Sequence, residues 1–190
     1  MKAMFIGLAL AGPVAAFEND YAALMRDRAA EVQEAQPGLR RLELPGPVIV
    51  EERRQADGSL VYSGRDLSGF VAAGCGLAQL VDAVLLAGRC PAVMSEADRA
   101  RLQGTLAELA RFVGENAYPP VPEDKVRPKL VALMLARSVT AELTGTAACP
   151  EEGGTQDAAE IARNLARPGG QSAIWRMMGF PRLPVEAPCP

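Results

Sequence analysis

The 190-residue chain contains no histidine. Histidine is the usual general base near neutral pH, the central residue of Ser/His/Asp and Cys/His triads, and a common ligand of zinc and haem. The sequence therefore excludes these triads and any histidine-ligated metal. We expect neither a metal site nor a bound cofactor.

An excess of either charge is also missing. The chain has 20 basic and 23 acidic side chains, which gives a net charge of −3. Nucleic-acid binding needs a concentrated basic surface, so we expect no nucleic-acid partner. The charged runs Arg40-Arg41 and Glu51-Glu52-Arg53-Arg54 are modest, and together they mix both signs. They fit solvated faces.

The N-terminus is typical of a secretory signal peptide. It has one lysine, an apolar run and a Gly-Pro break, and it ends in the small residues Val14-Ala15-Ala16. The apolar run is shorter than the roughly 20 residues that span a bilayer. We therefore predict that residues 1–16 are removed and that residues 17–190 form a single domain. This domain is expected to be periplasmic or secreted, without a transmembrane anchor.

Most of the remaining sequence has the apolar periodicity of helices. The first is expected near the mature N-terminus, with Asn19 or Asp20 as its cap and Pro37-Gly38 as its end. Seven consecutive apolar residues from Leu130 to Ala136 predict that the helix containing them is the central one. The other predicted helices run from Gly69 to Gly88, from Ser95 to the Tyr118-Pro119-Pro120 break, from Glu123 to Leu143 and from Thr155 to Leu165, followed by a short turn at 172–178.

The segment from Gly69 to Gly88 has nearly the length of a transmembrane helix and contains one charge, Asp82, in 20 residues. A central aspartate costs about 3 kcal/mol on membrane insertion. The segment also contains four glycines. We therefore interpret it as a buried helix of a helical bundle.

One β-hairpin is predicted at about 46–65. Its strands are the β-forming residues 48–50 and 60–62, and Asp57-Gly58 between them is a hairpin turn signal. The tail 181–190 contains four prolines and is expected to be extended. The predicted fold is therefore mainly α, a single-domain bundle of four to five helices with one small β-hairpin and two disulfides.

The four cysteines of an exported chain favour two disulfides. If residues 76–88 are helical, Cys75 and Cys90 are separated by about 20 Å, which is too far for a bridge. Short connections make the helices at 69–88, 95–118 and 123–143 successively antiparallel. The C-terminal ends of the first and third of these then lie at the same pole of the bundle. Cys90 and Cys149 follow those two helices, so the predicted pairs are Cys90–Cys149 and Cys75–Cys189.

Carboxylates are the catalytic groups that this composition most easily permits, as in glycoside hydrolysis. The candidates are Asp82 and Glu142, because burial within their apolar helices would raise their pKa. The structural alternative for Asp82 is a buried acid paired with Arg137 or Arg89. For Glu142 it is a solvated charge near a helix end. No catalytic motif accompanies either residue.

A candidate binding surface lies near the C-terminus, where the only tryptophan stands among other large side chains. It consists of Trp175, Arg176, Met177 and Phe180. Tryptophan, methionine and arginine are enriched at the centres of protein interfaces. The structural alternative is a hydrophobic plug that closes the bundle beneath the tail.

The leading hypothesis is an exported, periplasmic, non-enzymatic protein that binds another protein or an envelope component. Two alternatives stay open. One is an envelope glycan hydrolase that uses Asp82 or Glu142. The other is a carrier of a small apolar ligand, in which the helices at 69–88 and 123–143 line a cavity.

Overall fold

The structure, a computed structural model, describes residues 17–149 and 156–189. The predicted signal peptide at residues 1–16 lies outside these ranges. The described residues form six α-helices, a four-stranded antiparallel sheet and two short 3-10 turns at 29–31 and 91–93. The helices are α1 (Tyr21–Asp27), α2 (Ala73–Arg89), α3 (Glu96–Asn116), α4 (Glu123–Thr144), α5 (Gln156–Ala166) and α6 (Pro168–Met178), and the strands are β1 (Gln33–Gln36), β2 (Leu39–Leu44), β3 (Val48–Arg54) and β4 (Leu60–Asp66).

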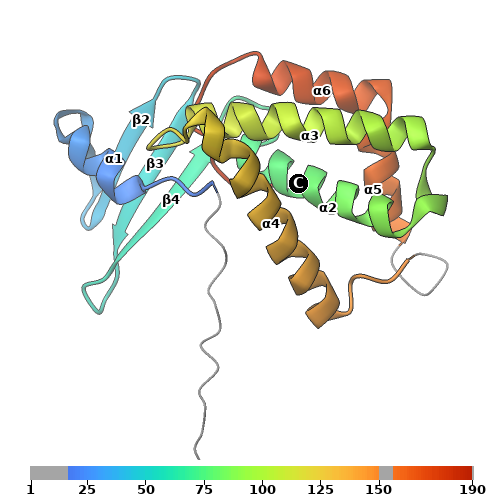
Figure 1. Cartoon of the computed structure of the whole chain (residues 1–190). Helices are drawn as coiled ribbons and strands as arrows, with labels where there is room; N and C mark the ends of the chain where they lie inside the picture. Colours follow the sequence, from blue (N-terminus) through green and yellow to red (C-terminus); the bar gives the residue numbers. More distant parts are fainter. Residues whose placement is uncertain (1–16, 150–155, 190) are drawn as a thin grey trace, which may run out of the picture.

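The predicted fold class, a helical bundle with one small hairpin, is wrong because the sheet is larger. Figure 1 shows the sheet with α1 at one side of the molecule and the other five helices beside it. The strands follow one another as a meander, in the order β1-β2-β3-β4. The predicted hairpin corresponds to β3 and β4. In contrast, β1 occupies the last part of the first predicted helix, and β2 follows the predicted end of that helix.

Each connection within the sheet turns at a glycine with positive φ. These glycines are Gly38 (76°), Gly46 (97°) and Gly58 (86°). Pro37-Gly38, predicted to end a helix, is instead the turn between β1 and β2. Proline presets the first central position of such a turn, and glycine accepts the positive φ of the second. The same dipeptide, Pro45-Gly46, connects β2 to β3.

Cross-strand ion pairs explain how the charged strand β2 fits into the sheet. Arg40 lies opposite Glu52 and Arg41 lies opposite Glu51, with N–O distances of 2.7 and 2.8 Å. Glu52 is buried and also accepts a hydrogen bond from the Tyr62 hydroxyl. Opposite charges at facing positions stabilise a sheet. The two charged runs that were predicted to be solvated therefore pair with each other across β2 and β3.

The central helix is α2, as its burial shows. Nine of its residues are buried, which confirms the prediction of a buried helix there. The prediction that the helix at 123–143 is central is wrong, because α4 buries only Val126. Its outward face carries Val131, Leu135, Val139 and Leu143, of which 49 to 83% is exposed. An apolar run does not tell which faces of a helix have neighbours.

Both predicted disulfides are present, with Cα–Cα distances of 5.5 Å for Cys75–Cys189 and 5.6 Å for Cys90–Cys149. Cys90 follows α2 and Cys149 follows α4, and the bridge joins the chain just beyond these two helices. The pairing deduced from helix order is therefore confirmed, although α4 is not central. Two disulfides are typical of a protein from an oxidising compartment.

A buried ion pair joins the sheet to the helical part. Asp66, at the end of β4, accepts a 2.6 Å hydrogen bond from Arg182 Nε, and the two side chains are 1% and 0% exposed. The same guanidinium donates to the carbonyls of Met177 and Phe180 and lies over the Phe70 ring. One arginine therefore holds together the end of β4, the end of α6 and the segment before α2.

The C-terminal tail continues from this ion pair between β4 and α2. Val185 is fully buried, and its carbonyl accepts a 3.0 Å hydrogen bond from the Gly74 N–H. The carbonyl of Ala187 accepts another from Asp66 at 2.8 Å. A Cβ on Gly64 or Gly74 would collide with Val185. The tail is therefore part of the core, and Cys189 fixes its end to α2.

Breaking the Asp66–Arg182 pair on one side is expected to destabilise the fold strongly. Asp66→Leu or Arg182→Met should each lower the free energy of unfolding by about 3–5 kcal/mol, because each leaves an unpaired buried charge. The double variant should lose less than the sum of the two single losses, since neither charge remains. Urea unfolding measures all three. Arg111→Met, which removes an exposed ion-paired arginine from α3, is the control and should change little.

Candidate ligand-binding groove

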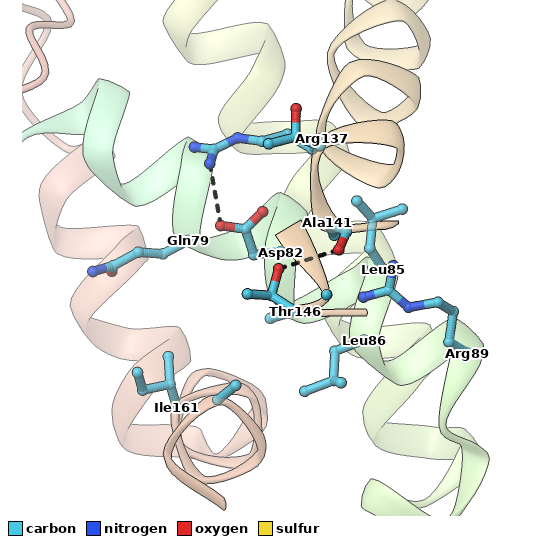
Figure 2. Close-up of a pocket in the computed structure, with 13 residues that line it drawn as sticks. Gln79, Asp82, Leu85, Leu86, Arg89, Arg137, Ala141, Thr146 and Ile161 are labelled. Carbon is cyan, nitrogen blue, oxygen red and sulfur yellow. Dashed lines mark hydrogen bonds and ion pairs between the residues drawn. The ribbon is translucent and has the colours of Figure 1, made fainter. Parts of the chain in front are cut away.

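A groove of about 400 Å³ lies between α2, α4 and α5 (Figure 2). Its volume falls within the range of small-molecule sites. Its walls are mostly apolar, with one carboxylate and two guanidinium groups among them. The lining residues are Gln79, Asp82, Ala83, Leu85, Leu86, Arg89, Arg137, Thr140, Ala141, Gly145, Thr146, Ala158 and Ile161.

One face of α2 forms a long wall of this groove. Gln79, Asp82, Leu86 and Arg89 follow one another at intervals of three or four residues, so they lie on the same side of the helix. Opposite them, α4 ends at Gly145, whose φ of 71° turns the chain back. The groove is therefore a gap between α4 and α5 that runs along the central helix α2.

The predicted candidate Asp82 lies in this groove and pairs with Arg137 of α4. Arg137 Nη1 and Asp82 Oδ2 are 3.5 Å apart, as Figure 2 shows. Of the two partners considered from the sequence, the structure selects Arg137 and not Arg89. The ion pair bridges α2 and α4 across the groove.

The environment of Asp82 raises the pKa of its carboxyl group above the ordinary value. The main cause is desolvation by the surrounding protein, which the positive charges of Arg137 and Arg89 oppose. The side chain still has 56% of its surface accessible, so the groove is open to solvent at this point. Asp82 therefore combines access from solvent with a raised proton affinity.

Arg89, the last residue of α2, has no partner in the groove. Its Nε and Nη1 atoms are buried without a hydrogen-bond partner among the described residues. In Figure 2 its guanidinium group points from α2 toward Ala141 and Thr146. A charged donor without an acceptor is unfavourable in a partly buried place. This arginine is the polar group of the groove that the described residues leave unsatisfied.

Glu142, the other predicted acid, does not join the groove. It is exposed near the C-terminal end of α4 and is absent from the groove lining. Asp82 is therefore the single acid among the described lining residues. The structure does not bring together the two carboxylates that the sequence singled out.

The candidate binding surface near the C-terminus is divided by the structure. Trp175 and Phe180 are 51% and 60% exposed, and Arg176 is also exposed. Met177 is buried in the core. Phe180 stacks on Phe70, with 6.3 Å between the ring centroids. Three of the four residues are therefore accessible to a partner, and Met177 supports them from within.

Sequence reasoning missed Arg89 and Ile161 as groove residues, and treated Arg89 only as a partner for Asp82. One signal was present, namely the polar residues Gln79, Asp82 and Arg89 on one side of an otherwise apolar helix. The contribution of α5 had no such signal, because nothing in the sequence of this helix shows that Ile161 faces α2 across a groove. Ile161 is 49% exposed and lines the groove.

Comparisons with protein-family models, with curated proteins and with solved structures find no match for this chain. Within residues 17–149 and 156–189, no cluster of three or more potential ligands is arranged to hold a metal ion. In the same ranges no helix combines the length and apolar character needed to cross a membrane. The fold and the groove therefore carry the functional argument.

The pKa of Asp82 should be measurably raised, and Arg137→Gln should raise it further by removing an attractive charge. The pKa of Asp82 is higher in the folded state than in the unfolded state. The free energy of unfolding should therefore fall as the pH rises from the unfolded-state pKa to the folded-state pKa. Asp82→Asn should remove this part of the pH dependence. Carboxyl-resolved NMR titration gives the pKa, and urea unfolding at several acidic pH values gives the stability. An Asp82 pKa at or below the ordinary value would contradict the expectation.

Proposed function

We propose that this chain is an exported, non-enzymatic binding protein that holds a small apolar envelope component in the groove between α2, α4 and α5. The observation that carries the proposal is the groove itself. It has the volume of a ligand site, and Leu85, Leu86 and Ile161 give it apolar walls. The two disulfides support a location in the periplasm or outside the cell.

The position of α4 supports a role in binding. This helix packs against α2 and α3 through one face and buries a single residue, Val126. A second hollow of about 680 Å³ lies beside the groove, toward the N-terminal part of α2, and Arg137 and Thr140 border both spaces. Elements with few buried contacts are those that move most easily when a ligand binds. We assign to α4 the role of an adjustable wall.

An envelope glycan hydrolase is the second candidate, because Asp82 lies in an open groove and has a raised pKa. A raised pKa is the property of a general acid in such enzymes. Glycoside hydrolysis uses two carboxyl groups that flank the scissile bond, whereas the described groove lining offers one. Clearing of purified peptidoglycan by the mature protein, lost in Asp82→Asn, would favour this candidate over a binding protein.

Filling the groove should abolish binding of a neutral apolar probe. Ala158 is exposed and lines the groove, so Ala158→Trp adds bulk there without entering the core. The wild-type chain should bind Nile red at one saturable site, seen as a rise in the dye's fluorescence, and Ala158→Trp should lose this binding. Ala100→Trp, at an exposed position of α3 outside the groove, is the matched control and should bind normally. Equal binding by Ala158→Trp and wild type would show that the dye binds elsewhere and would refute the proposal.

A further inference from the structure

The groove contains a cation, Arg89, whose side chain has no hydrogen-bond or ion-pair partner among the described residues. Among the described residues, no hydrogen bond or ion pair involves the Arg89 side chain, and its Nε and Nη1 atoms are shielded from solvent. The third nitrogen, Nη2, is not among these shielded atoms, and Arg89 lines the groove. Arginine is charged at every physiological pH and has only donors. The missing partner is therefore an acceptor, and an anion would fit best.

The charges of the groove lining also favour an anionic ligand. Arg89 and Arg137 contribute two positive charges and Asp82 contributes one negative charge, which leaves +1 among the described lining residues. Asp82 already pairs with Arg137. A ligand with one negative charge would balance the remaining arginine, whereas a cation would meet an unpaired positive charge.

The rest of the groove is suited to an alkyl chain. Leu85, Leu86 and Ile161 supply apolar surface beside the charged groups. From Arg89 back to Gln79 the wall formed by α2 is about 15 Å long, at 1.5 Å per residue. Arg89 stands at one end of this wall. The charged end and the apolar length together describe an amphipathic ligand.

We propose that the groove binds a single-chain amphiphile with a monoanionic carboxylate head, which accepts hydrogen bonds from Arg89 while its chain lies along α2. This inference rests on the proposed function and names the class of its ligand. A charge-assisted pair between guanidinium and carboxylate is the strongest common interaction available to such a head. Arg137 stays with Asp82 and keeps α4 in place beside the bound chain.

The test compares dodecanoate, uncharged dodecanol and cationic dodecylammonium as competitors of Nile red on the mature protein. Dodecanoate should bind most tightly and dodecylammonium least. In Arg89→Gln the affinity for dodecanoate should fall by about tenfold or more, since a hydrogen bond to a charged group is lost. The affinity for dodecanol should not change. Arg53→Gln, at an exposed position of β3 outside the groove, is the matched control and should leave all three affinities unchanged.

A second variant changes the charge of the groove in the opposite direction. Asp82→Asn raises the net charge of the lining from +1 to +2, so dodecanoate should bind more tightly while dodecanol is unaffected. A general loss of folding would not produce opposite effects of the two variants on the same ligand. If Arg89→Gln does not fold, the affinity of Asp82→Asn for dodecanoate still tests whether the groove binds an anionic head.

Equal affinity of the wild-type protein for dodecanoate and dodecanol would overturn the inference. An unchanged preference for dodecanoate in Arg89→Gln, or no gain in Asp82→Asn, would do the same. In these cases loss of Nile red binding in Ala158→Trp would still support an apolar ligand site. The proposed function and the anionic class of its ligand can therefore be refuted independently.

Discussion

The Asp66–Arg182 ion pair is the contact on which the arrangement of sheet and helices depends. Two charges with almost no solvent access are tolerated only when each has its partner and further hydrogen bonds. Arg182 also binds two carbonyls near the end of α6, so the tail cannot leave β4 without exposing a buried charge. The same tail inserts Val185 between β4 and α2 and ends at the disulfide with Cys75. Sheet and helices therefore form one structure.

A rigid centre and a lightly packed edge follow from this arrangement. The disulfides hold both ends of α2, one to the tail and the other to the chain beyond α4. By contrast, α4 covers α2 incompletely and turns an apolar face outward. The groove lies where the rigid helix and the lightly packed helix meet. Binding sites commonly combine a fixed wall with an element of low local stability.

Local signals in the sequence predicted several elements correctly. The buried helix α2, the hairpin at Asp57-Gly58 and the start of α3 at Ser95 were predicted because each depends on neighbouring residues. The Ser95 hydroxyl oxygen accepts a hydrogen bond from the Asp98 N–H. The strands β1 and β2 were missed because polar and charged residues occupy much of them. Ion pairs with β3 stabilise β2, and β1 pairs with β2. Pro37-Gly38 was assigned to a helix end because this dipeptide ends a helix as readily as it forms the turn of a hairpin. Of the candidate site, Asp82 was named as a functional residue, whereas Arg89 was named only as a partner for Asp82.

The sequence by itself determined the absence of histidine chemistry, the balanced charge, the helical majority and the pairing of the cysteines. The first three follow from composition and local pattern, and the cysteine pairing follows from the rise of a helix per residue together with the order of the helices. Only the tertiary structure decided that α2 and not α4 is central and that the tail enters the core. It also decided that, among the described residues, Asp82 has a partner and Arg89 has none. Each of these depends on which residues far apart in the chain meet, and on the water that their contact excludes. Burial and charge pairing are properties of that contact and not of any single segment.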